Sequence, residues 1–236
     1  MAKRIFFLLI LCVLIITFIN RVQVNVYSAN TPINKENVVN ATVEGVYLSI
    51  TGFQSPNASI ILTTQNGQFL ASTTADSKGY FTISNILINS TISEVCLQAV
   101  DFKRLGESYS CINISSKVTK DLVYQNIFLP PTIGLSKKKI NAGQNAIIFG
   151  YTMPNGTVYL TIEDKIITLK ADENGYYQYI YENVKAGVYR LSATGELNGA
   201  KSLTPMRGAT LEALSLPAQV TTTAQKIAEE AKKKFP

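Results

Sequence analysis

The sequence predicts an all-β protein with two tandem β-sandwich modules that follow an N-terminal signal or anchor helix. An internal repeat carries this prediction, because residues 52–60 (GFQSPNASI) return 98 residues later as residues 150–158 (GYTMPNGTV). A second repeat follows each copy, since residues 75–81 return 96 residues later as residues 171–177. Short segments in which apolar and polar residues alternate, separated by turn signals, are typical of β-sandwiches and β-barrels. Repetition at a nearly constant spacing indicates that the structural unit itself is duplicated.

The N-terminal segment, residues 1–28, predicts export from the cytoplasm. Lys3 and Arg4 precede an apolar run at residues 5–19, which as a helix would span about 22 Å. This length is short of the ~30 Å hydrocarbon core of a bilayer, so a signal peptide cleaved after Ser28 is favoured. The alternative is an uncleaved anchor that holds the protein to the membrane. Both alternatives place the rest of the chain outside.

The remaining chain divides into four predicted segments. Pro130 and Pro131 favour extended geometry and indicate a linker between the modules. Pro205 and Pro217 interrupt the strand pattern near the C-terminus, where residues 224–235 have the spacing of a short helix. The predicted boundaries are module 1 at 40–120, a linker at 121–132, module 2 at 133–203, and a disordered or helical tail at 204–236.

Alternating apolar residues and turn signals place the expected strands. In module 1 Val46, Leu48 and Ile50 alternate with more polar residues, the period-two pattern of a half-buried strand. The strands expected in module 1 are 43–53, 59–64, 68–74, 80–84, 94–100 and 109–115. Those expected in module 2 are 146–151, 157–163, 166–171, 176–181 and 188–194.

The repeated residues themselves are predicted to be structural turns. In each Asp-x-x-Gly segment the aspartate is expected to cap its own turn. This interpretation is favoured over a calcium loop, which needs several oxygen ligands. The first segment offers few carboxylates, whereas the second, with Glu173 and Asn174, is richer. The predicted turn residues are Gly52, Pro56, Asn57, Asp76 and Gly79 in the first copy, and Gly150, Pro154, Asn155, Asp172 and Gly175 in the second.

Composition argues against catalysis and against nucleic-acid binding. The chain of 236 residues has no histidine, the commonest general base and metal ligand, and no tryptophan. The net charge is +6, and five of the positive charges lie at the two ends of the chain. The middle therefore has no evident basic stripe of the kind that binds nucleic acid. We therefore expect a non-enzymatic protein without a cofactor, metal or nucleic-acid partner.

Cys96 and Cys111 are the candidates for a disulfide. If their two strands form a hairpin centred between Lys103 and Arg104, the two cysteines face one another directly. A disulfide suits an exported chain and would add about 3 kcal/mol in the chain-entropy model. The alternative is a pair of buried, unbonded thiols.

Tyr177, Tyr179 and Tyr181 are a candidate binding face. Strand alternation puts all three on one side of the sheet. Packing of the amphipathic rings against the sheet is the favoured interpretation, and a platform for a ligand is the alternative.

These motifs have a family resemblance. The Gly-aromatic-x-x-Pro-Asn pattern before a strand resembles bacterial Ig-like repeats of surface proteins. Residues 171–177, followed by residues 183–189 (NVKAGVY), are similar to collagen-adhesin B-type and carboxypeptidase regulatory-like domains. Module 1 matches these domains less well, because it has no counterpart of the Ala-Gly pair at residues 186–187. The resemblance covers about residues 40–202 and implies sandwiches of the immunoglobulin or prealbumin type.

The resemblance also implies a function. Such domains serve as stalks, spacers and adhesion modules, so we expect an exported or cell-surface structural spacer or adhesion scaffold. The alternative is a module that binds a glycan or protein through its loops or through the tyrosine-rich face. Envelope, glycan and protein partners all fit these expectations, because turn motifs specify fold better than function.

Overall fold

The computed structural model describes residues 45–89, 91–114 and 120–215. These residues form β-strands and turns without a helix. Within them no helix is long and apolar enough to cross a membrane. The predicted signal or anchor at 1–28 and the predicted helix at 224–235 lie outside the described residues.

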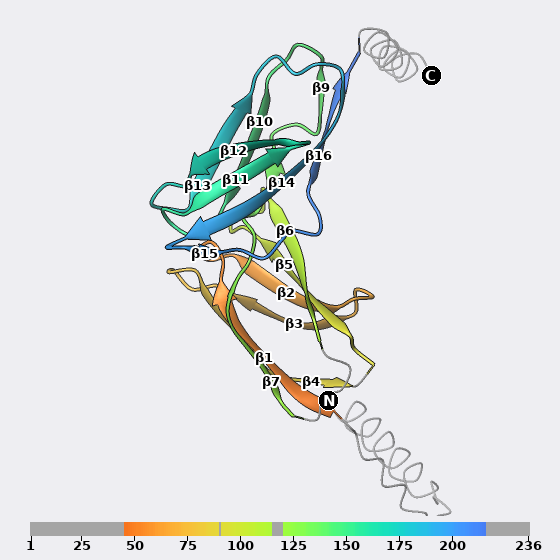
Figure 1. Ribbon diagram of the computed structural model, residues 1–236, viewed down its shortest axis with the longest axis vertical. Coiled ribbons are helices and arrows are strands. Elements are labelled where there is room, and N and C mark those ends of the chain that lie inside the picture. The colour runs from red at the N-terminus through yellow and green to blue at the C-terminus, as the bar shows by residue number, and fades with distance from the viewer. Residues whose placement is uncertain (1–44, 90, 115–119, 216–236) are drawn as a thin grey trace, which may run out of the picture. The chain divides into compact units, whose positions relative to one another are not determined.

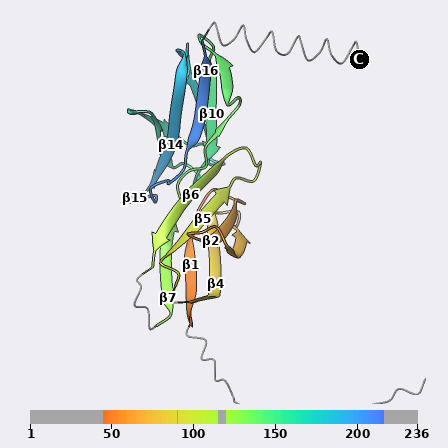
Figure 2. The same cartoon turned by 90° about the vertical axis from the view of Figure 1, so that its right-hand side faces the viewer.

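The first sandwich packs a three-stranded sheet, in the order β4-β1-β7, against a four-stranded sheet, in the order β3-β2-β5-β6. Figure 2 shows β1 lying between β7 and β4. The strands are β1 (Gly45–Phe53), β2 (Ser59–Thr64), β3 (Phe69–Thr74), β4 (Tyr80–Asn89), β5 (Glu94–Val100), β6 (Glu107–Asn113) and β7 (Leu122–Phe128). Alternate residues of β1, such as Leu48 and Ile50, are fully buried between the sheets, as strand periodicity requires.

The strand order of the first sandwich differs from that of immunoglobulin constant domains. Those domains place strands A, B, E and D in one sheet and C, F and G in the other. Here the first, fourth and seventh strands share a sheet, and the first strand runs parallel to the seventh. The first sandwich therefore does not have the strand order of an immunoglobulin constant domain.

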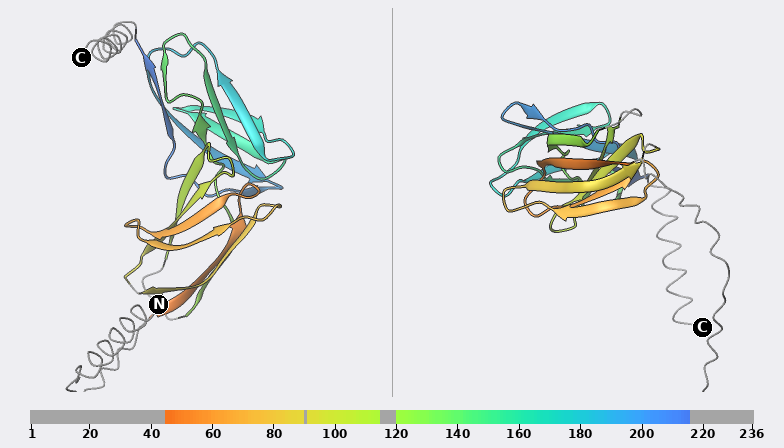
Figure 3. Two further views of the ribbon diagram at one scale, coloured as in Figure 1. Left: turned by 180° about the vertical axis from the view of Figure 1, so that it is seen from behind. Right: turned by 90° about the horizontal axis from the view of Figure 1, so that it is seen from below.

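The second sandwich has a three-stranded sheet, in the order β13-β10-β8, and a larger sheet, in the order β12-β11-β14-β16-β9, with β15 paired to β14. The strands are β8 (Gly134–Leu135), β9 (Lys139–Asn141), β10 (Ala146–Tyr151), β11 (Thr157–Ile162), β12 (Lys165–Lys170), β13 (Tyr176–Tyr181), β14 (Gly187–Leu197), β15 (Ala200–Lys201) and β16 (Ala209–Leu214). Figure 1 labels these strands except β8, and Figure 3 shows them from behind and from below.

The sequence repeat has a counterpart in strand pairing. Gly52 of β1 lies opposite Phe81 of β4, and Gly150 of β10 lies opposite Tyr177 of β13. The strands beside β1 and β10 differ, however. β7 runs parallel to β1 and follows it in the chain, whereas β8 runs antiparallel to β10 and precedes it. The third strand of this sheet is thus supplied by a later part of the chain in the first sandwich and by an earlier part in the second.

The predicted linker at 121–132 is wrong. Its residues 122–128 form β7, which pairs with β1, and residues 128–134 are all buried. The linker prediction fails at Pro130 and Pro131 because the two rings pack inside the protein. Proline also lacks an N–H group, so this buried extended segment has fewer donors to satisfy.

The predicted end of module 2 at residue 203 is also wrong. β16 pairs with β14 and β9, and its Leu211 and Ala213 belong to the core of the second sandwich. Pro205 interrupts the strand pattern only locally, in the segment that leads into β16. The second sandwich therefore includes residues up to 214.

Gly52 and Gly150 lie within strands, so the prediction that they form turns is wrong. A Cβ on Gly52 would lie 2.1 Å from the carbonyl oxygen of Ile127. A Cβ on Gly150 would lie 1.8 Å from the carbonyl oxygen of Thr132 and 2.7 Å from the Tyr177 hydroxyl. Each glycine is needed because a neighbouring backbone segment passes directly over it.

We expect Gly150→Ala to lower the free energy of unfolding by about 3 kcal/mol, since the added methyl group must displace buried backbone. The matched control is Gly199→Ala, at a position with φ of +81° and nothing within 4 Å of the added Cβ. This control should lose only about 1 kcal/mol through backbone strain. Urea unfolding of both variants measures the difference, and equal losses would contradict the steric explanation.

Candidate functional site at the sandwich junction

The two sequence repeats fold into one corner in each sandwich. In the first corner Gln54 N–H donates to Gly79 O at 2.9 Å, and Ala75 N–H donates to Ala58 O at 2.9 Å. The second corner repeats these bonds, with Thr152 N–H to Gly175 O at 2.9 Å and Ala171 N–H to Gly156 O at 2.9 Å. The two repeats of each copy are therefore the two hydrogen-bonded halves of a single corner.

Side chains and special backbone angles fix these corners. Asp76 Oδ1 accepts the N–H groups of Lys78 at 2.8 Å and Tyr80 at 2.9 Å. Asp172 Oδ1 likewise accepts those of Asn174 and Tyr176, both at 2.8 Å. Positive φ angles in both corners occur at Asn57, Gly79, Asn155 and Gly175. Each aspartate is thus engaged by its own turn.

The corners meet where the two sandwiches join. A Cβ on Gly79 of the first corner would lie 2.6 Å from Sδ of Met153 in the second corner. Gln54 is fully buried, and its Nε2 donates to Pro130 O at 2.9 Å and to Ser108 Oγ at 3.3 Å. A residue of the repeat therefore holds the buried segment that leads from one sandwich to the next.

The β5–β6 hairpin loop, residues 101–106, enters the same junction. Asp101 is buried, and its carboxylate accepts the N–H groups of Lys103, Leu105 and Gly106. Beyond the loop, Glu107 and Ile133 exchange two backbone hydrogen bonds of 3.3 and 3.0 Å. The loop is fixed internally by Asp101 and joined externally to the second sandwich.

A pocket of about 500 Å³ opens between the corners and this loop, and we call it the corner pocket. Its lining residues are Pro56, Asn57, Ser77, Phe102, Lys103, Leu105, Tyr151, Pro154, Asp172, Glu173, Asn174 and Tyr176. Phe102 contacts Tyr151 edge-on with ring centroids 5.1 Å apart, and Tyr151 contacts Tyr176 at 5.2 Å. Such aromatic contacts stabilise the pocket wall.

Electrostatics in the corner pocket centre on Lys103. Its ammonium lies 5.5 Å from the Phe102 ring centroid and 5.8 Å from that of Tyr151. A hydrogen bond to the Tyr151 side chain is the main cause that raises the pKa of Lys103, with Coulombic interactions adding to it. Burial is the main cause that raises the pKa of Tyr176. At neutral pH the lysine is charged and the tyrosine is neutral.

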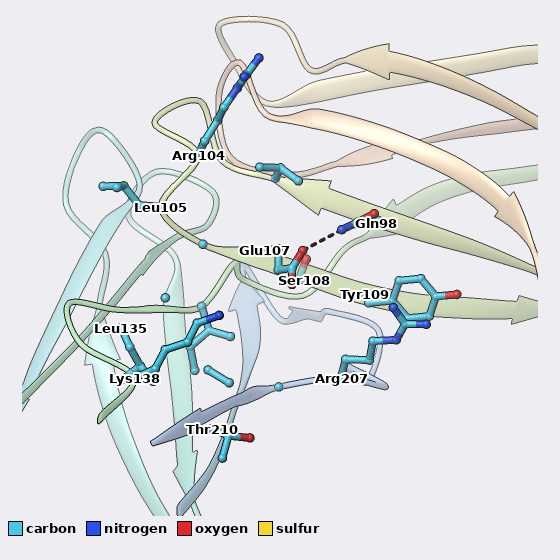
Figure 4. Close-up of a pocket in the computed structure, with 16 residues that line it drawn as sticks. Gln98, Arg104, Leu105, Glu107, Ser108, Tyr109, Leu135, Lys138, Arg207 and Thr210 are labelled. Carbon is cyan, nitrogen blue, oxygen red and sulfur yellow. Dashed lines mark hydrogen bonds between the residues drawn. The ribbon is translucent and has the colours of Figure 1, made fainter. Parts of the chain in front are cut away.

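A second pocket, of about 460 Å³, also lies at the junction (Figure 4). The Arg207 guanidinium stacks over the Tyr109 ring at 3.9 Å, and Glu107 accepts a 2.7 Å hydrogen bond from Gln98. Figure 4 shows Arg104 directed away from the other labelled side chains. The charges of Arg207 and Glu107 are thus each engaged by a neighbouring side chain.

The structure pairs Cys96 with Cys111 directly across β5 and β6. Their sulfur atoms are bonded at 2.06 Å, with 3.9 Å between the Cα atoms. A carboxylate oxygen of Glu94 and the two sulfur atoms all lie within 4.8 Å of one another. Both thiols are consumed by the disulfide, however, so this group lacks the thiolates that would bind a metal.

The tyrosine face points inward, which contradicts its use as an exposed platform. Tyr177 is 2% exposed and its hydroxyl donates to Thr132 O at 2.7 Å. Tyr179 and Tyr181 are partly buried against the core of the second sandwich. The three rings do share one face, but that face lies against the core. Tyr176, from the opposite face of β13, reaches the corner pocket instead.

Sequence reasoning missed Phe102, Lys103 and Glu173 as pocket residues. Phe102 and Lys103 were placed only at the tip of a predicted hairpin, and Glu173 was placed only in a predicted turn. An apolar residue at a hairpin tip was the available signal, because such loops are normally polar.

Comparisons with known proteins give fold likenesses alone. No protein-family model matches the chain, and no curated protein does. The D0-D1 domains of intimin align with 14% identity over 68% of this chain and 84% of that chain, with a TM-score of 0.31. A Ca²⁺-stabilised ice-binding adhesin of an Antarctic bacterium aligns with 14% identity over 69% and 41%, with a TM-score of 0.30. Because these scores are low, the fold rests on this chain's own strand pairing.

We expect Cys96 and Cys111 of the exported protein to react with an alkylating reagent only after reduction. Peptide mass spectrometry with and without reductant measures this. Cys12 is the internal control in any chain that keeps its N-terminal segment, because its alkylation should not depend on the reductant. Alkylation of Cys96 and Cys111 in the unreduced, unfolded chain would contradict the disulfide.

We expect Tyr177→Phe to cost about 1 kcal/mol at neutral pH through loss of the hydrogen bond to Thr132. Burial raises the Tyr177 pKa far above its usual value, so the folded state keeps this proton when the unfolded state releases it. The stability contributed by this group is therefore complete below pH ~10 and falls by about 1.4 kcal/mol per pH unit above it. Urea unfolding should show a shallower alkaline decline in Tyr177→Phe, and an unchanged slope would contradict the assignment.

Proposed function

We propose that this chain is a non-enzymatic exported or cell-surface protein whose two tandem sandwiches act as a structural spacer or adhesion scaffold. Its strand pairing supports a β-sandwich architecture. The repeated corners support the finer interpretation of two related modules of the collagen-adhesin or prealbumin type. The N-terminal apolar run supports export, either with cleavage or as an anchor.

The buried junction is the observation that carries the scaffold proposal. Leu203 N–H donates to Phe128 O at 2.7 Å, and Met206 N–H donates to Tyr109 O at 2.8 Å. Ser110 Oγ donates to Thr204 O at 2.9 Å. These bonds add to the Glu107–Ile133 pair, so segments from both sandwiches hold each other. A spacer needs such a junction because a fixed geometry transmits position and force between its ends.

The side chains also support a non-enzymatic role. The chain has no histidine to activate a nucleophile. Asp76, Asp101 and Asp172 each accept hydrogen bonds from backbone amides of their own loops. The carboxylates that the sequence offers at these loops thus serve the architecture.

The scaffold proposal predicts a narrow distribution of distances between the sandwiches. Spin labels at Ser72→Cys and Lys165→Cys, both exposed positions, can be measured by pulsed EPR in a Cys12→Ser background. Gly134→Val is the junction control, because its Cβ would lie 2.2 Å from Leu105 O. We expect it to broaden the distribution. An equally broad distribution in the unaltered junction would contradict a fixed spacer.

The location is tested separately on intact cells that produce the chain. A membrane-impermeant amine reagent should modify exposed lysines such as Lys78 and Lys165 without lysis. A cytoplasmic protein in the same cells is the control and should stay unmodified. Labelling that appears only after lysis would contradict surface exposure.

A further inference from the structure

We propose that the corner pocket binds a neutral saccharide of one or two sugar rings. Its volume of about 500 Å³ falls in the range of about 300–1,000 Å³ typical of small-molecule sites. The inference goes beyond the scaffold role and does not depend on it. The protein could act as a rigid spacer even if this pocket bound no sugar.

Phe102 supplies the apolar surface that a sugar ring requires. Its side chain is 49% exposed and Leu105 beside it is 50% exposed, which is costly for large apolar groups in water. The loop that carries them is held by three N–H bonds to the buried Asp101 carboxylate. Phe102 is therefore an exposed platform on a fixed loop. Such preorganisation lowers the entropic cost of binding.

The charges of the pocket favour a neutral ligand. Lys103 already places an ammonium over the faces of two rings, so a cationic ligand would meet a like charge there. Asp172 and Glu173 on the opposite corner repel an anionic ligand. A sugar avoids both penalties because its hydroxyl groups pair with either charge and its ring face is apolar.

Polar groups from both sandwiches surround this platform. Asn57 and Ser77 belong to the first corner, whereas Glu173 and Asn174 belong to the second, and all four are exposed. Amide, hydroxyl and carboxylate groups provide both donors and acceptors for sugar hydroxyls. Asp172 binds backbone amides through Oδ1; within the described part of the chain no hydrogen bond engages Oδ2. The site exists only where the two corners meet.

The test is titration of the full chain with cellobiose, maltose, lactose and N,N′-diacetylchitobiose, each followed by saturation-transfer NMR and calorimetry. At least one probe should bind saturably with a Kd in the millimolar range or below. Phe102→Ala should then weaken binding about tenfold, as expected when an aromatic contact is lost. The matched control is Phe69→Ala, whose ring is 61% exposed in β3 outside the pocket, and it should bind as the unaltered chain does.

A second variant tests the polar rim without touching the platform. Glu173→Gln keeps the shape of an exposed side chain and should weaken binding severalfold, since charged acceptors form stronger hydrogen bonds. Thermal unfolding of each variant should match the unaltered chain. Absence of saturable binding for all four probes, or equal weakening by Phe69→Ala and Phe102→Ala, would overturn the proposal. Neither result would affect the distance and surface-labelling tests of the scaffold.

Discussion

The close passage of residues 128–134 against Gly150 is the constraint on which the structure depends. Gly150 has no side chain, so the Thr132 carbonyl can approach it, and the Tyr177 hydroxyl donates to that same carbonyl at 2.7 Å. On the other side, Gln54 binds the Pro130 carbonyl. Because residues from both repeats hold this one segment, the two sandwiches cannot separate without exposing buried polar backbone.

This constraint explains why the repeated sequences contain residues that do not form turns. The aspartates and positive-φ residues shape each corner, but the glycines and aromatic residues between strands allow the neighbouring backbone to pack closely. Packing then brings the corners together beside the 101–106 loop. The corner pocket is a consequence of this arrangement, since each corner supplies part of its wall.

Much of the fold was predictable from local pattern. Period-two alternation predicted strands such as residues 59–64 and 176–181, which the structure forms as β2 and β13. The hairpin between Cys96 and Cys111 follows from symmetry about residues 103 and 104, and the register agrees. Residues 122–128 and 209–214 were missed because β7 and β16 pair with strands distant in the sequence and lie within a few residues of prolines.

The sequence by itself determined most of the strands, most of the turn residues and the sequence repeat, because these depend on period, φ preference and self-similarity. Only the tertiary structure decided which face of β13 is buried, and it placed Tyr177 in the core and Tyr176 at a pocket. It also brought Phe102 beside Tyr151 and Glu173 into the same wall, although these residues are 49 and 71 positions away in the chain. Side-chain alternation defines two faces, but burial against a distant strand selects between them.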